Sequence, residues 1–186
     1  MRQGVFQSNA FPHPLARIGA VLMLAWQVGP TLGQADKADG LVGQGVTLAE
    51  QMIVYSDDVA AGEKAFDATL QGLTKIYSFL EKEAVAPAGS AMTIYTPTEV
   101  RLAVPVGKPP RSLPQGLSVG KSPAGKALKF VHRGSYDSLE ETIEALTDQL
   151  EQKGLEAPNV LVELYLTDLR TTPQDKLVIE IYVLIE

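Results

Sequence analysis

The sequence predicts an α+β fold built from two β-α-β-β repeats, which form an antiparallel sheet with two main helices. The first observation is that strand, helix, strand and strand patterns follow one another in this order twice along the chain. The second is an internal match: shifting the sequence by 70 positions places one helical pattern on the other. The matched helix positions are Phe66 with Tyr136, Leu73 with Ile143, Ile76 with Leu146, and Leu80 with Leu150.

The composition fits one ordinary globular domain. The chain has 186 residues, 45% of them hydrophobic, which is enough apolar material for a core. Its net charge of -6 disfavours nucleic acid and anionic membrane surfaces as partners. It contains no cysteine, which excludes disulfides, thiolate metal sites and a thiol nucleophile.

Residues 1–35 have the pattern of a secretory signal peptide. Arg2 and Arg17 precede the apolar run Ile18–Trp26, and small residues at Gly33 and Ala35 have the spacing that a signal peptidase requires. We therefore expect cleavage after Ala35 and a periplasmic or secreted bacterial protein with no stable membrane span. An internal start codon and a short membrane anchor are the alternatives. Residues 36–45 are small and polar and predict a flexible lead-in.

The first repeat is expected over residues 46–106. A strand pattern ends near Ser56, a turn follows at Asp57 and Asp58, and an amphipathic helix runs from Phe66 to Leu80. Two more strands are predicted, one ending at Tyr95 and one over residues 100–106. In the latter, Pro105 indicates a sheet edge or a strand end, because proline has no N–H to donate.

The second repeat is expected over residues 117–186, after a proline-rich linker at 107–116. A strand pattern covers residues 125–134, and a helix covers 135–154. Ser138 and Glu141 have capping-box spacing, and Gly154 is placed as the C-cap. Strands at Val162–Leu166 and Ile179–Val183 complete the repeat, joined by a loop at 167–175.

Each of these last two strands carries a glutamate followed two positions later by a tyrosine. Side chains alternate between the faces of a strand, so Glu163 points to the same side as Tyr165, and Glu180 to the same side as Tyr182. A carboxylate beside an aromatic ring in an apolar strand is unusual and makes these residues candidates for a binding site.

The second repeat resembles the second half of the GyrI-like domain, which is also known as the effector-binding domain of AraC-type regulators and has the SOUL/GyrI-like fold. The resemblance covers nearly all of residues 46–186 and is strongest in the second half, which carries the motifs H-x-G-x-Y and E-x-Y, a loop proline and a last-strand acid. The matching residues are His132, Gly134 and Tyr136, then Glu163 and Tyr165, then Pro173, and finally Glu180. The chain departs from the family pattern at Leu184, where proline is frequent, and at Thr147 and Asp148, where relatives often carry tryptophan.

The resemblance implies two repeats related by a pseudo-twofold axis, with a groove between the halves. It also implies that an acidic residue in the groove meets an amphipathic, often cationic small molecule. The ligand-binding residues predicted on this basis are Glu180, Glu163, Tyr165, Tyr182, Tyr95 and Tyr136.

Each candidate also has a structural interpretation. Glu180 could instead form an ion pair with Arg101, which the repeat places at the equivalent position, or lie exposed on a strand face. Glu163 could make a structural hydrogen bond, and the tyrosines could belong to the core. His132 is expected to be structural, and no motif supports a metal site, a catalytic triad or a phosphate loop around it.

The leading functional prediction is an exported domain that binds or sequesters a small amphipathic molecule without cofactor or metal. One alternative is a hydrolase of reactive electrophiles, in which a groove glutamate acts as general base. Another is an envelope protein-interaction module that binds a protein partner.

Overall fold

The computed structural model describes residues 43–57, 65–154 and 159–185. The helices are α1 (Ala65–Lys82) and α2 (Leu139–Gln152), with short 3-10 turns at η1 (Tyr136–Ser138) and η2 (Gln174–Lys176). The strands are β1 (Gln44–Leu48), β2 (Met52–Ser56), β3 (Met92–Tyr95), β4 (Val100–Pro105), β5 (Ser118–Lys121), β6 (Gly125–Arg133), β7 (Leu161–Tyr165) and β8 (Val178–Leu184). The α+β class predicted from the sequence is confirmed.

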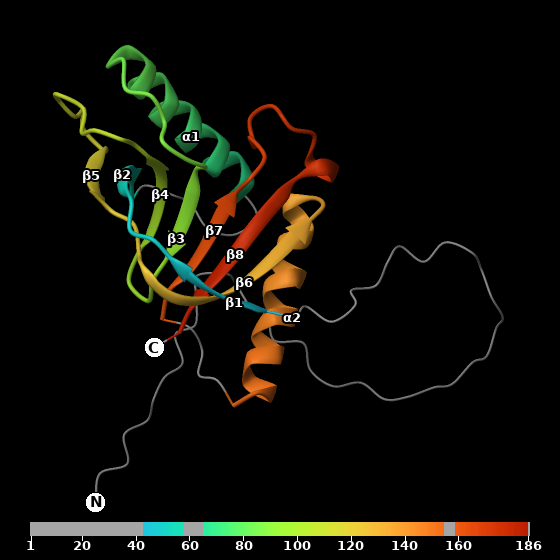
Figure 1. Ribbon diagram of the computed structural model, residues 1–186. Coiled ribbons are helices and arrows are strands. Elements are labelled where there is room, and N and C mark those ends of the chain that lie inside the picture. The colour runs from blue at the N-terminus through green and yellow to red at the C-terminus, as the bar shows by residue number, and fades with distance from the viewer. Residues whose placement is uncertain (1–42, 58–64, 155–158, 186) are drawn as a thin grey trace, which may run out of the picture.

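The strands form one antiparallel sheet in the order β1-β6-β8-β7-β3-β4-β2-β5. Both helices lie on one face of this sheet, while the segment from β1 to β2 runs across the other (Figure 1). The order is symmetric about the central β7–β3 pair, with three further strands on either side of this pair. The two repeats therefore meet at the middle of the sheet.

The register of the central pair locates the pseudo-twofold axis. Thr93 and Glu163, which the 70-residue shift makes equivalent, are paired directly with each other. On either side, Met92 pairs with Leu164, the equivalent of Ile94, and Ile94 pairs with Val162, the equivalent of Met92. The axis therefore passes through the Thr93–Glu163 pair.

The two ends of the sheet are drawn together by two short connections. Only residues 49–51 separate β1 from β2, and only 122–124 separate β5 from β6, although β1 and β5 lie at opposite ends of the strand order. At the seam, the Gln51 N–H donates to Ser122 Oγ at 3.0 Å, and the Ser122 N–H donates to the Gln51 carbonyl at 2.8 Å. The sheet consequently curls around its helix-free face.

Two apolar clusters fill the two faces. The larger one lies under the helices and includes Leu73 and Ile76 of α1, Leu146 of α2, and Ile179 and Ile181 of β8. The smaller one fills the curled face and contains Ile53, Met92, Ile94, Ala103, Ala127, Val162 and Tyr182. Both faces of the central strands are therefore buried, which explains their nearly continuous apolar sequence.

Two strands were not predicted from the sequence, and the predicted capping box does not form. Each repeat starts with an additional strand, β1 or β5, and β1 starts at Gln44, inside the range predicted as a lead-in. Ser138 does not close a capping box, because its hydroxyl donates to the Ser135 carbonyl at 2.9 Å. Pro105 is a strand end, as one of the two alternatives stated, and Gly154 adopts φ +69° just past α2. The predicted signal peptide lies outside the described residues.

Candidate functional site

Glu163 lies at the centre of the molecule, on the helix-covered face of the sheet. It is fully buried, and its strand neighbours are Thr93 of β3 and Ile181 of β8. Leu161 and Tyr165, two positions away on either side, belong to the main core. The alternation along β7 thus places one carboxylate inside an apolar layer, where an ionised group without compensating partners is costly.

A chain of hydroxyl groups leads to this carboxylate. Tyr165 Oη donates to Glu163 Oε2 at 3.0 Å, and Thr93 Oγ1 lies 2.5 Å from the same Tyr165 hydroxyl. A phenol has one hydrogen, so donation to Glu163 leaves Thr93 as the donor to Tyr165. The other carboxylate oxygen, Glu163 Oε1, is buried and has no hydrogen-bond partner among the described residues.

Two more tyrosines complete the surroundings of Glu163. Tyr95 and Tyr136 are both buried, and hydrogen bonding with their hydroxyls and that of Tyr165 acts to lower the pKa of Glu163. Tyr136 packs its ring against Phe66 of α1, with ring centroids 5.2 Å apart, and hydrogen-bonds with Thr69 of the same helix. The three tyrosines and Glu163 are called the central cluster below.

Burial dominates the electrostatics of this cluster. It raises the pKa of Glu163 to about 7, more than the tyrosine hydrogen bonds lower it. The pKa values of Tyr95, Tyr136 and Tyr165 are also raised, first by burial and then by neighbouring groups that include the Glu163 charge. Near neutral pH, Glu163 is therefore divided between its acid and its carboxylate forms, while the three phenols stay protonated.

Two clefts share Tyr77 of α1, and one of them reaches the central cluster at Tyr165. The inner cleft, of about 170 Å³, lies between α1 and the β7–β8 loop and is lined by Leu73, Tyr77 and Tyr165 among others. The outer cleft, of about 500 Å³, is lined by the last turns of α1, residues 84–87 and Arg170. Tyr165 connects the inner cleft to Glu163 through its hydroxyl.

Glu180 and Tyr182 do not join the central cluster, so the prediction that they share a groove with Glu163 is wrong. In the β7–β8 register, Glu163 pairs with Ile181, and Glu180 pairs with Leu164. This offset of one residue sends Glu180 and Tyr182 to the opposite face of the sheet. There Tyr182 Oη donates to Glu180 Oε2 at 2.5 Å, and Lys129 Nζ lies 3.2 Å from Glu180 Oε1.

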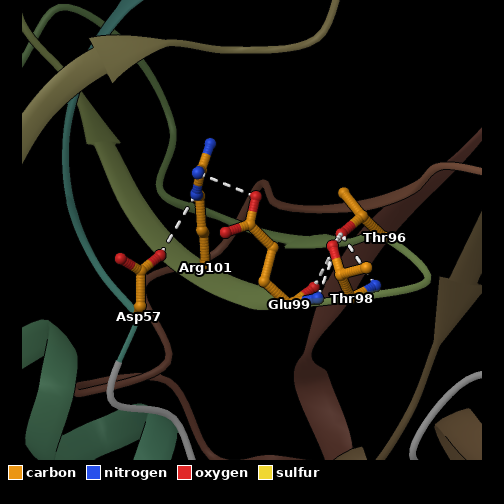
Figure 2. Close-up of polar contacts among 5 residues, drawn as sticks. All are labelled: Asp57, Thr96, Thr98, Glu99 and Arg101. Atoms are coloured by element: carbon orange, nitrogen blue, oxygen red, sulfur yellow. Dashed lines mark hydrogen bonds and ion pairs between the residues drawn. The ribbon is translucent and has the colours of Figure 1, made fainter.

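Arg101 does not neutralise either glutamate. It does occupy the position equivalent to Glu180, because Ile94 pairs with Arg101 as Leu164 pairs with Glu180. Its guanidinium lies 3.1 Å from Asp57 Oδ1 and 2.7 Å from Glu99 Oε1, beside the turn of Thr96 and Thr98 (Figure 2). The ion pair proposed between Arg101 and Glu180 is therefore wrong.

His132 has two side-chain contacts within its own half of the molecule. It is buried, with Nδ1 2.8 Å from Thr142 Oγ1 and Nε2 3.0 Å from the Ser135 carbonyl. A carbonyl can only accept, so Nε2 carries a hydrogen. These contacts fix the η1 turn that carries Tyr136, in agreement with a structural role.

The structure brings together four of the predicted residues, whereas their hydroxyl and helix partners were not predicted. These four are Glu163, Tyr165, Tyr95 and Tyr136. Thr93, Thr69 and Phe66 were not named as site residues. Thr93 could have been found, because the repeat aligns it with Glu163 on the symmetry axis.

Within the described residues there is no cluster of His, Cys, Asp and Glu side chains suited to a metal ion. In the same part of the chain, no helix has the length and apolar character needed to cross a bilayer.

Comparison with solved structures places this architecture in a known class. EcmrR, solved in its complex with DNA, superimposes with a TM-score of 0.64 at 17% identity over 76% of this chain and 57% of that one. The EcmrR C-terminal domain gives 0.57 at 16% identity, covering 78% of this chain and 99% of that one. SAV2435, solved bound to tetraphenylphosphonium, gives 0.50 at 13% identity over 76% and 92%. No curated protein sequence matches significantly.

The fold and its buried acidic centre define a duplicated α+β domain of the ligand-binding type. The family model for the GyrI-like small molecule binding domain matches residues 74–186. The chain belongs to the GyrI-like family, and it spans 57% of the length of EcmrR in the DNA complex.

Proposed function

We propose that the protein binds a small lipophilic cation at the central cluster, with Glu163 as its counter-charge. The observation that carries this proposal is the state of Glu163: it is fully buried, and Oε1 is left without a hydrogen-bond partner within the described residues. A buried acceptor without a partner is unfavourable in the free protein, and a ligand that supplies positive charge removes that penalty.

The tyrosines around Glu163 favour an aromatic or otherwise lipophilic cation. Aromatic faces attract cations by about 0.5 to 2 kcal/mol per ring, with the larger values in desolvated sites. Three tyrosine rings around one carboxylate therefore complement a charge that is spread over an apolar body. Glu163 is fully buried, so neighbouring side chains must move when a ligand enters.

The comparisons support the same ligand class. The matched family model describes small-molecule binding, and SAV2435 was solved with the lipophilic cation tetraphenylphosphonium. Carrying this chemistry over to the present chain is part of the proposal, because the identity to SAV2435 is 13%.

Calorimetric titration with tetraphenylphosphonium tests the proposal. We expect the wild-type protein to bind it and to bind the neutral analogue triphenylphosphine oxide at least tenfold more weakly. Glu163→Gln should lose the preference for the cation. Glu180→Gln is the matched control, because Glu180 lies on the opposite face of the sheet, and it should bind like wild type. Equal binding of both ligands, or an unchanged Glu163→Gln variant, would contradict the assignment.

A hydrolase is the second candidate function, favoured by the pKa of Glu163. A carboxylate with a pKa of about 7 is suited to act as general base near neutral pH. Consumption of an electrophilic ester or epoxide panel, followed by mass spectrometry, tests this candidate. Turnover that disappears in Glu163→Gln would support it, and no turnover above the rate in buffer would reject it.

We further propose that the protein acts after export. The support is the apolar run Ile18–Trp26 between Arg17 and the small residues Gly33 and Ala35. Amino-terminal sequencing of protein from a cell envelope extract should give a sequence that starts at Asp36 and continues Lys37, Ala38. A mature chain that retains Arg17 and is recovered only with cytoplasmic markers would overturn this part of the proposal.

A further inference from the structure

Two polar side chains of the β7–β8 loop form a contact with α1 beside the two clefts. The guanidinium carbon of Arg170 lies 3.8 Å from the centre of the Tyr77 ring. Asp168 accepts two hydrogen bonds from the guanidinium, at Oδ1 from Nε (3.0 Å) and at Oδ2 from Nη2 (2.7 Å). We call Asp168, Arg170 and Tyr77 the clamp.

The clamp lies where the outer and inner clefts adjoin. Tyr77 lines both clefts, whereas Arg170 lines only the outer one and Asp168 only the inner one. The inner cleft has Tyr165 on its wall, and the Tyr165 hydroxyl reaches Glu163. Its volume of about 170 Å³ is below the range of about 300 Å³ and more that is typical of small-molecule sites. The two clefts share Tyr77, so a ligand that moves from the outer into the inner cleft passes the Tyr77 ring on which Arg170 lies.

The clamp is held mainly from within its own loop. The Asp168 carbonyl accepts the N–H groups of Thr171 at 3.2 Å and Thr172 at 2.9 Å, and Asp168 Oδ1 also accepts the Arg170 N–H at 3.0 Å. The contact with α1 is the stacking of Arg170 on Tyr77. Moving the guanidinium off the ring therefore breaks no hydrogen bond of the sheet or of α1.

We propose that Arg170 gates the passage from the outer cleft to Glu163 and sets the rate at which cations enter and leave. This inference rests on the proposed function, since it assumes that Glu163 is the destination. Tyr77 and Asp168 offer an aromatic face beside a carboxylate, the same pair of groups that surrounds Glu163. A lipophilic cation replaces the guanidinium on Tyr77 and Asp168 on its way inward, because it satisfies the same two groups. Neutral and anionic molecules cannot make this exchange.

Stopped-flow binding of the fluorescent cation rhodamine 6G tests the gate. Arg170→Ala and Asp168→Asn should increase both the association and the dissociation rate by roughly 2- to 30-fold, the factor that corresponds to one cation–π contact. The equilibrium constant should stay within about threefold, because a gate changes the barrier and not the end states. Arg111→Ala removes an exposed arginine that lines neither cleft, and its rates should equal those of wild type.

A second readout needs no ligand. Nitration of Tyr165 by tetranitromethane, followed by peptide mass spectrometry, reports access to the inner cleft, and it should be faster in Arg170→Ala than in wild type or Arg111→Ala. Circular dichroism melting curves confirm that each variant is folded.

Unchanged rates together with unchanged nitration overturn the gate, even where rhodamine binding still requires Glu163. A changed affinity at an unchanged association rate also overturns it, since Arg170 would then belong to the bound state. If rhodamine does not bind wild type, the proposed function fails, and nitration alone decides the gate.

Discussion

A single buried carboxylate makes the stability of this protein depend on pH. Glu163 has its pKa raised to about 7 in the folded protein, from an ordinary value of 4.5. The folded state therefore keeps a proton that the unfolded state has already lost. Stability contributed by this group is full below about pH 4.5 and is lost as the pH rises toward about 7.

Replacing Glu163 by glutamine should remove this pH dependence. The unfolding free energy of Glu163→Gln minus that of wild type should rise by on the order of 3 kcal/mol from about pH 4.5 to about pH 8. Urea unfolding at both pH values measures the effect, with the exposed Glu144→Gln as control. Parallel curves for wild type and Glu163→Gln would show that burial does not perturb this acid.

Thr93 should matter through its hydroxyl. It is buried and donates to Tyr165, so Thr93→Val, which keeps the shape, leaves the Tyr165 oxygen without its donor. We expect a loss of about 1 to 2 kcal/mol in unfolding free energy. The exposed Thr98→Val is the control in the same chemical denaturation experiment. A loss no larger than that of the control would show that the hydroxyl chain has no energetic role.

At the scale of elements, Gly72 sets the distance between α1 and the sheet. A methyl group at this position would lie 2.5 Å from Leu102 Cδ2, a fully buried side chain of β4. The helix can therefore approach the sheet closely only at a residue without a side chain. This contact fixes the helix that carries Phe66 and Thr69, the partners of Tyr136 in the central cluster.

Helix propensity and packing make opposite predictions for Gly72→Ala. Propensity alone would stabilise the helix by about 1 kcal/mol, whereas overpacking costs about 1 to 3 kcal/mol. Leu102 cannot relax into solvent, so we expect a lower melting temperature, and Leu102→Val in the same background should recover part of the loss. Gln71→Ala, on the exposed side of α1, serves as the control in calorimetric melting. A more stable Gly72→Ala protein would show that α1 shifts freely on the sheet.

The sequence could predict the helices and central strands, because their patterns are long and periodic. It could not predict β1 or β5. The residues of β1 include glycine and polar side chains and are mostly exposed, so they pair through their backbone without an apolar period. The four residues of β5 are too short for a period to be read. The sequence also could not predict which face of the sheet carries Glu180, since this depends on a one-residue offset between β7 and β8.

For the whole molecule, proton and ligand binding should be coupled at Glu163. The proposed cationic ligand pairs with the ionised carboxylate, while the free protein holds a proton up to about pH 7. We expect the affinity for tetraphenylphosphonium to rise up to tenfold per pH unit below about pH 7 and to level off above it. Calorimetric titration across this range measures the slope, and the Glu163→Gln variant should show none. An affinity that does not change between about pH 5 and about pH 7 would place the ligand away from this acid.

The position of Glu163 on the pseudo-twofold axis has a consequence for how such a site can arise. In a symmetric dimer of two identical half-size chains, the residue at the axis faces its own copy. A glutamate there would place two carboxylates side by side in the core, where like charges repel strongly. Once both halves are joined in one chain, a threonine can stand opposite the glutamate and support it through Tyr165. A single acid at the centre is thus a property that covalent fusion of the halves permits and that self-association of equal halves does not.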